Sequence, residues 1–149
     1  MAEVLKVVEM ADKKYTASVV GCGVGGCMSL NALAASDRFE LVAACDVNEA
    51  ARHAVAERFP RVLTYASHQE LFEENGTDVV CVSTWPPSHR EVVLAALDLP
   101  SVKGMLVEKP LADSYAAGKG LLDALRAKGL PVCVPHGLLK LNHGREILR

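Results

Sequence analysis

The stretch Ser18-Val19-Val20-Gly21-Cys22-Gly23-Val24-Gly25-Gly26-Cys27-Met28-Ser29 decides the fold predicted for this chain. An apolar run ends in three glycines spaced G-x-G-x-x-G, and a helix-like segment follows at once. In such a unit the first glycine permits a tight turn, the second admits a diphosphate, and the third lets helix and strand pack closely. Free N–H groups and the helix dipole favour an anion there. The residues predicted to hold the diphosphate of a dinucleotide are Gly21, Gly23, Val24, Gly25 and Gly26.

The rest of the chain alternates short β-branched runs with helical segments, which is the pattern of successive βαβ units. Strands are expected at Ala17–Val20, Glu40–Cys45, Arg61–Thr64, Asp78–Ser83, Gly104–Val107 and Pro131–Val134. Helices are expected at Gly25–Ala35, Glu49–Arg58, His68–Glu74, His89–Leu97 and Ser114–Lys128. Right-handed crossovers then predict an α/β fold, namely a three-layer, doubly wound, mostly parallel sheet with strand order 3-2-1-4-5-6.

Capping signals support these helix bounds. The segments 67–70 and 88–91 both fit the S-x-x-E capping box, and Asp113 is a candidate cap for the last helix. Asn75-Gly76 and Lys128-Gly129 are plausible helix ends.

Composition narrows the class of protein. The 149 residues, half of them apolar, suit one domain with a single substantial core. A net charge of −2 without a run of Lys or Arg argues against nucleic acid as the main partner. No apolar stretch reaches the length of a membrane span, and the N-terminus lacks the features of a secretory signal. We therefore expect a soluble, cytoplasmic protein without a membrane partner.

The five cysteines do not suggest a disulfide framework, and no metal-ligand spacing is present. Cys45, Cys81 and Cys133 lie in or beside apolar runs, where cysteine behaves as a small hydrophobic residue. Reduced and mostly buried thiols are therefore expected. Cys22 flanks the glycine loop, and exposure beside a cofactor would make it an oxidation site but not a catalytic group.

A carboxylate follows the second predicted strand. Asp46 lies 20 residues after Gly26, where it can accept hydrogen bonds from the adenosine ribose hydroxyls and repel a 2′-phosphate. This favours NAD over NADP. Two alternatives stay open: Asp46 could cap the helix that starts near Asn48, and Arg52, one turn further on, could reach a 2′-phosphate.

Two further loops follow buried strands at the same expected edge of the sheet, where ligands bind in doubly wound folds. Thr84 and Trp85 are predicted to line the nicotinamide half of the site, and prolines stiffen the loop. His89 is either a cofactor contact or a surface residue in a capped first turn. After the fifth strand, Lys109 is a candidate for stabilising charge on a substrate oxygen, and Glu108 for holding the lysine or the nicotinamide ribose. The alternative is that Glu108 and Lys109 are a solvated charge pair in the loop after this strand, without a role at the site.

Taken together, Gly21-x-Gly23-x-x-Gly26, Asp46, Thr84-x-x-x-x-His89 and Glu108-Lys109-Pro110 resemble the glucose-fructose oxidoreductase, inositol dehydrogenase and rhizopine catabolism (Gfo/Idh/MocA) family. The resemblance covers about residues 16–140. It implies a two-domain NAD(P)-dependent dehydrogenase that acts on a hydroxyl or ketone of a sugar, cyclitol or related polyol. By that resemblance Lys109 assists proton movement at the substrate. The cofactor contacts it implies are the glycine loop, Asp46, Thr84, Trp85, Pro86, His89 and Glu108.

The chain departs from the family pattern at two residues and in its length. Trp85 stands where a proline is usual, and Lys140 occupies the place of a common arginine. The family's second domain, which shapes the substrate pocket and usually carries the oligomer contacts, would begin near Asn142. We therefore expect an N-terminal extension at residues 1–15, a Rossmann domain at 16–141, and the start of a linker helix at 142–149. A stand-alone, non-catalytic NAD-binding or redox-sensing module is the alternative to the dehydrogenase.

Overall fold

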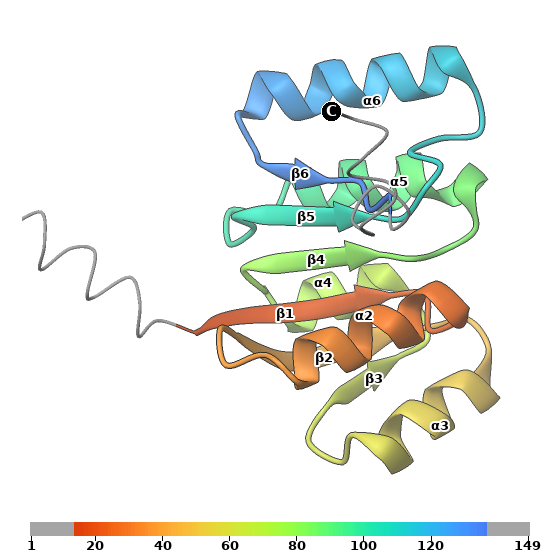
Figure 1. Ribbon diagram of the computed structural model, residues 1–149, viewed down its shortest axis with the longest axis vertical. Coiled ribbons are helices and arrows are strands. Elements are labelled where there is room, and N and C mark those ends of the chain that lie inside the picture. The colour runs from red at the N-terminus through yellow and green to blue at the C-terminus, as the bar shows by residue number, and fades with distance from the viewer. Residues whose placement is uncertain (1–13, 137–149) are drawn as a thin grey trace, which may run out of the picture.

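Six strands form one sheet in the order β3-β2-β1-β4-β5-β6, and every neighbouring pair is parallel (Figure 1). The computed structural model describes residues 14–136. The strands are β1 (Tyr15–Val20), β2 (Phe39–Cys45), β3 (Leu63–Tyr65), β4 (Val79–Val82), β5 (Gly104–Val107) and β6 (Val132–Cys133). The helices are α2 (Val24–Ala34), α3 (Glu49–Arg58), α4 (His68–Glu74), α5 (Pro86–Leu97) and α6 (Tyr115–Lys128).

The predicted fold class and strand order are confirmed. Strand β1 begins at Tyr15, one residue before the predicted start of the domain. The rest of the predicted N-terminal extension, the role of Lys140 and the linker helix at 142–149 lie outside the described residues.

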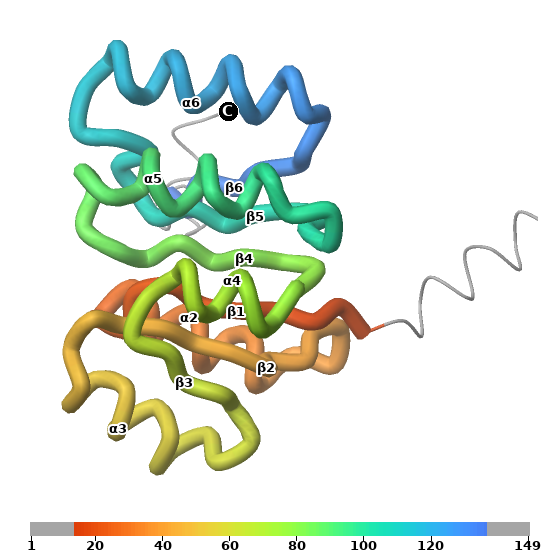
Figure 2. The backbone as a smooth tube through the Cα atoms, turned by 180° about the vertical axis from the view of Figure 1, so that it is seen from behind, coloured from red at the N-terminus to blue at the C-terminus, as the bar shows by residue number. Residues whose placement is uncertain are grey.

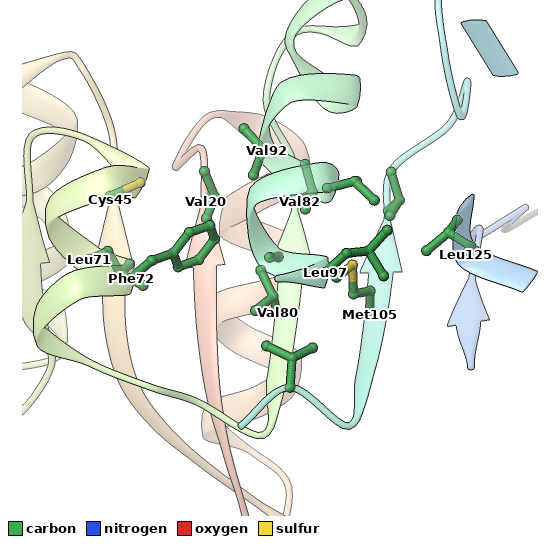
Figure 3. Packing of buried hydrophobic residues seen from close by; sticks show 14 of the residues in the cluster. Val20, Cys45, Leu71, Phe72, Val80, Val82, Val92, Leu97, Met105 and Leu125 are labelled. Carbon is green, nitrogen blue, oxygen red and sulfur yellow. The ribbon is translucent and has the colours of Figure 1, made fainter. Parts of the chain in front are cut away.

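The helices cover both faces of the sheet. Helices α2 and α3 lie in front of it in Figure 1, and the reverse view in Figure 2 shows α4 and α5 on the other side. Side chains that alternate along β1 and β4 separate accordingly: Val20 and Val82 join the core under α4, α5 and α6, whereas Val19 and Cys81 join the core under α2 and α3. Figure 3 shows the first of these cores, in which Val20, Val80 and Val82 meet Phe72, Val92 and Leu97. Burial on both faces explains why the strands carry so few charges.

Helix α5 begins at Pro86, three residues earlier than predicted. A proline is tolerated in the first turn of a helix because the N–H that it lacks would have no partner within the helix there. The capping box predicted at Ser88 is therefore wrong. Ser88 lies within the first turn, where its Oγ donates to the carbonyl oxygen of Trp85 at 2.8 Å and lies 2.9 Å from Thr84 Oγ1, which can donate to it.

Among the other predicted helix ends, Ser67 and Gly129 are confirmed and Asp113 is wrong. Ser67 caps α4 by accepting from the N–H of Glu70, as predicted, and the Glu70 carboxylate accepts from Ala66 N. Helix α6 is capped by Ser114 rather than by the predicted Asp113. It ends at Gly129, whose φ of 63° is readily adopted by glycine.

The cysteines differ in part from expectation. All are free, and Cys45 and Cys81 are buried as predicted. Cys133 is exposed because it lies on the edge strand β6, so its predicted burial is wrong. Cys22 is only 6% exposed, and burial, aided by the nearby Asp46 carboxylate, raises the pKa of its thiol to about 12. The alternative that Cys22 is exposed beside the cofactor is therefore wrong, and its thiol is a poor oxidation site.

A carboxylate ties together three strands at the end of the sheet away from the glycine loop. Asp78 Oδ2 accepts from Thr16 N at 3.0 Å and from Thr16 Oγ1 at 3.3 Å, and Oδ1 pairs with the Lys103 ammonium group. The Lys103 contact, supported by the Thr16 hydrogen bonds, lowers the pKa of Asp78. A carboxyl group with a lowered folded-state pKa stabilises the fold above its unfolded pKa, near about 3.9, and loses this contribution as the pH falls through the folded value.

We therefore expect Asp78→Asn to lower the free energy of unfolding at pH 7 by about 1 kcal/mol. The difference between wild type and variant should shrink below about pH 4, because the unfolded chain takes up a proton there and the folded carboxylate does so at a lower pH. Urea unfolding measured from pH 7 to pH 3 checks this. Asp123→Asn is the control, because Asp123 pairs with Lys119 on an exposed face of α6 and such pairs contribute little. A difference for Asp78→Asn that is constant across this pH range would contradict the assignment.

Candidate functional site

The glycine loop connects β1 to α2 at the carboxyl edge of the sheet. Gly21 has a φ of +90°, and a Cβ there would lie 2.7 Å from the main chain of Ser83. A Cβ on Gly26 would lie 1.8 Å from the carbonyl oxygen of Gly21. By contrast, a Cβ on Gly23 would meet no described protein atom within 4 Å. The first and third glycines are thus required by the fold itself, whereas the second borders open space.

Asp46 links the tip of β2 to this loop. Its Oδ2 accepts from Cys22 N at 2.7 Å, and its Oδ1 accepts from Asn48 N at 2.8 Å. A carboxylate has about four lone-pair positions, so it can still accept from a ligand. The cap of α3 is Asn48, whose side chain accepts from Ala50 N at 2.9 Å. The alternative that Asp46 caps this helix is therefore wrong.

Arg52 is held by main-chain carbonyl groups. Its Nη1 donates to the carbonyl oxygen of Asp46 at 2.9 Å and to that of Val47 at 3.2 Å. In this arrangement the guanidinium group supports the loop after β2. These contacts do not support the alternative that Arg52 binds a 2′-phosphate.

A cleft of about 540 Å³ opens beside the glycine loop and Asp46. Five of the residues predicted from the sequence line it, namely Gly21, Gly23, Asp46, Thr84 and Trp85. It also takes in residues that were not predicted, among them Val47, Ser67, His68, Gln69, Ser83 and Glu91. Most of these belong to the ends of β2 and β4 and to the segment after β3. The alternating pattern already implied that these strand ends meet at one edge, and this signal could have identified them.

A second hollow, of about 680 Å³, lies on the α2 side of β4, β5 and β6. Its lining is largely apolar and includes Met28, Phe39 and Leu106, with Glu108 as its acidic residue. It contains neither Asp46 nor the first two glycines of the loop. We therefore assign the dinucleotide to the cleft beside Asp46.

His89 is fully buried and joins two loops. Its Nε2 lies 2.9 Å from the carbonyl oxygen of Thr84, after β4, and its Nδ1 lies 3.1 Å from the carbonyl oxygen of Pro110, after β5. The alternative of a surface residue is therefore wrong. A contact between His89 and the cofactor stays a prediction, and both ring nitrogens face carbonyl oxygens here.

Glu108 and Lys109 follow β5. The Glu108 side chain lies over the first turn of α2, with its Cγ 3.3 Å from the Cβ position of Gly25. Its Oε2 accepts from the main-chain N–H of Lys109 at 3.2 Å, so the contact that Glu108 makes is with the backbone of the lysine. Lys109 itself is exposed, and its peptide bond to Pro110 is cis. Within residues 14–136, no ion pair holds its ammonium group.

The predicted residues of α2 and α5 fall at helix starts. Val24 is the exposed first residue of α2, and Pro86 is the first residue of α5. The structure thus brings Gly25 against Glu108 and sets Asp46, Thr84 and Trp85 around one cleft.

Residues 15–136 match the sequences described as "Oxidoreductase family, NAD-binding Rossmann fold" and designated GFO_IDH_MocA. The chain belongs to the Gfo/Idh/MocA family. It carries the NAD-binding Rossmann domain of these oxidoreductases, and the predicted resemblance is confirmed.

Relatives of this Gfo/Idh/MocA domain are longer proteins. The chain is 25% identical over 134 residues to D-apiose dehydrogenase of Paraburkholderia graminis, covering 89% of this chain and 35% of that one. It is 34% identical over 91 residues to inositol 2-dehydrogenase/D-chiro-inositol 3-dehydrogenase of Shouchella clausii, covering 60% of this chain and 26% of the relative. The WlbA dehydrogenase of Chromobacterium violaceum, solved with NADH and UDP-GlcNAcA, superposes with a TM-score of 0.80 at 25% identity, covering 92% and 39%. The chain thus spans about a third of the relatives' length.

The residues present fit a bound NAD. Open space at Gly23 and the free N–H groups at the start of α2 suit a diphosphate. Within residues 14–136, the buried hydroxyl of Ser83 has no hydrogen-bond partner, and it lies beside the glycine turn. A polar ligand would satisfy this hydroxyl.

Between residues 14 and 136, no helix is both long and apolar enough to cross a bilayer. In the same range, no group of three or more His, Cys, Asp or Glu side chains is arranged to hold a metal ion.

Proposed function

We propose that this chain is the cofactor-binding domain of an NAD-dependent dehydrogenase that acts on a sugar, cyclitol or related polyol. The reaction would move a hydride between a substrate carbon, as alcohol or ketone, and nicotinamide, which supplies the redox chemistry. The observation that carries the proposal is the hydrogen bond from Cys22 N to Asp46. It unites the glycine loop and the ribose-binding carboxylate at one edge of the sheet. The dehydrogenase names of the relatives support the substrate class.

The preference for NAD over NADP rests on the charge of Asp46. Both of its oxygens are held by main-chain N–H groups, so the carboxylate is fixed before a ligand arrives. A fixed carboxylate accepts hydrogen bonds from the ribose hydroxyls and repels the phosphate that NADP carries there.

Lys109 is proposed to act at the substrate oxygen. The residue is the second after β5, and its exposed side chain follows Glu108, which lies over the first turn of α2. An ammonium group can donate a hydrogen bond to a ketone oxygen and stabilise the negative charge that develops there as hydride arrives. In the reverse direction, the uncharged amine would accept the hydroxyl proton.

Further parts of the proposal concern the whole protein. We propose a cytoplasmic location, which the five free cysteines support because reducing compartments keep thiols free. A small sugar or polyol is the proposed substrate, and homo-oligomerisation through a second domain remains part of the proposal.

Calorimetric titration of the chain with NAD and with NADP tests the function. We expect wild type to bind NAD at least about tenfold tighter than NADP, and Asp46→Ala to lose about tenfold for NAD while NADP loses less. Asp37→Ala is the matched control, because it removes the same charge from an exposed loop outside the cleft. Tighter NADP binding by wild type would contradict the Asp46 assignment, and absence of binding to either would refute the function.

A further inference from the structure

The loop between β5 and α6 receives few hydrogen bonds from other parts of the fold. At its start, Glu108 N donates to the carbonyl oxygen of Val82 at 2.8 Å, which continues the pairing of β5 with β4. Residues 109–113 then have no strand or helix partner of this kind. Within the part of the chain that the structure describes, the carbonyl of Pro110 is the one main-chain group of these five residues that a side chain from another element contacts.

The main chain is anchored on both sides of Lys109. The Lys109 N–H donates to Glu108 Oε2 at 3.2 Å, and Glu108 Cγ lies 3.3 Å from the Cβ position of Gly25 on α2. The next residue, Pro110, presents its carbonyl oxygen to His89 Nδ1 at 3.1 Å. Because no ion pair within residues 14–136 holds the Lys109 ammonium group, these main-chain contacts decide where the side chain starts.

The imidazole ring of His89 is a rigid bridge between two loops. The side chain is fully buried near the start of α5, and its Nε2 lies 2.9 Å from the carbonyl oxygen of Thr84, a residue that lines the cleft beside Asp46. A carbonyl oxygen can only accept, so each contact is a hydrogen bond when the ring nitrogen that faces it carries a proton. The ring thus spans from the loop of the cofactor cleft to the loop that carries Lys109.

We propose that His89 is a positioning residue for Lys109, whose main chain it holds by donating from Nδ1 to the carbonyl oxygen of Pro110. The proposal rests on the proposed dehydrogenase function and deepens it, because it gives His89 an indirect role in place of the predicted contact with the cofactor. Lys109 must reach the substrate oxygen while a hydride moves at nicotinamide, and small errors in such an alignment lower kcat steeply. A ring that joins the two loops keeps lysine and cofactor aligned.

Two substitutions separate the two contacts of the ring. Asparagine places an amide N–H₂ group near the position of Nδ1, and glutamine places one near that of Nε2. His89→Asn therefore keeps a donor toward Pro110, and His89→Gln keeps one toward Thr84. Each variant loses one buried contact, so a purely structural role predicts the same effect of both on turnover.

Turnover is measured in the two-domain dehydrogenase proposed above. We expect His89→Gln to lower kcat at least about tenfold, while the Kd for NAD changes less than about twofold. His89→Asn should keep most of the wild-type kcat, because the donor toward the Lys109 loop is retained.

Carbon NMR of the chain measures the link itself without turnover. The carbonyl carbon shift of Pro110, observed through the N–H of Leu111, should move in His89→Gln and stay near its wild-type value in His89→Asn. The carbonyl carbon shift of Thr84, observed through the N–H of Trp85, should show the reverse pattern, because each variant keeps a donor for only one of these oxygens.

Thr77→Val is the control for lost stability, since Thr77 is buried at the opposite end of the sheet, where its Oγ1 lies 2.9 Å from Ser18 Oγ. It should lower the free energy of unfolding and leave kcat unchanged. Equal losses of kcat in His89→Asn and His89→Gln, or an unmoved Pro110 carbonyl shift in His89→Gln, would overturn the positioning role while the dehydrogenase function stands. Absence of wild-type turnover with every sugar and cyclitol tested would refute the proposed function and, with it, this role of His89.

Discussion

Gly26→Ala is expected to abolish NAD binding and to lower the free energy of unfolding by about 3 kcal/mol or more. The added Cβ would lie 1.8 Å from the carbonyl oxygen of Gly21 and 2.8 Å from its carbonyl carbon. Both are main-chain atoms, so no flexible side chain can move aside. Gly21 in turn is confined by the main chain of Ser83, and the clash must therefore push α2 away from the end of β1.

Chemical unfolding and calorimetric titration with NAD measure the two effects separately. Gly120→Ala, on an open face of α6, should leave NAD affinity unchanged and raise the free energy of unfolding by about 0.5–1 kcal/mol. Gly23→Ala should fold like wild type, because its Cβ meets open space, but should bind NAD weakly because the methyl group enters the diphosphate site. Wild-type affinity in Gly26→Ala would show that the glycine turn does not hold the cofactor.

The second large effect is expected at Lys109, in the two-domain dehydrogenase proposed above. Lys109→Ala should reduce kcat by a factor of about 10²–10⁴, the usual contribution of a proton-transferring group, while the Kd for NAD changes less than about twofold. The exposed side chain takes no part in the packing described above, so its loss should not affect folding. Turnover is measured with a panel of sugars and cyclitols, and NAD binding by fluorescence or calorimetry.

Lys119→Ala is the control for this prediction, since Lys119 is an exposed lysine that pairs with Asp123 on α6. It should keep wild-type turnover. A loss of NAD affinity in Lys109→Ala equal to the loss of turnover would assign the lysine to cofactor binding and refute its role at the substrate oxygen.

The order of the sheet was predictable because its signals are local. The glycine spacing defines one strand–turn–helix unit, and alternation of β-branched runs with capped helices implies the remaining crossovers. The bounds of α3, α4 and β5 agree with the predicted ones for this reason. The start of α5 was missed because two consecutive prolines suggest a stiff loop, although the first turn of a helix accepts them.

The site was less predictable, because it depends on contacts between residues far apart in the chain. Cys22 is buried beside Cys45 because the turn directs its N–H to Asp46, and no property of the cysteine itself indicates this. The position of Glu91 in the cleft follows from the packing of α5, which pattern analysis does not resolve. His89 presents the same difficulty, since the sequence offered a cofactor contact or a surface position for it and gave no sign of the buried link.

The link that His89 forms has a practical consequence for altering this domain. One imidazole ring spans from the carbonyl oxygen of Thr84 to that of Pro110, so the loops bearing Trp85 and Lys109 are joined beneath the surface. A chimaera that takes only residues 108–110 from a relative would leave the His89 ring facing a carbonyl oxygen whose position was set by a different loop. Residues 84–89 and 108–110 should therefore be exchanged as one cassette from a single donor, and the same pairing is the natural unit for randomised libraries.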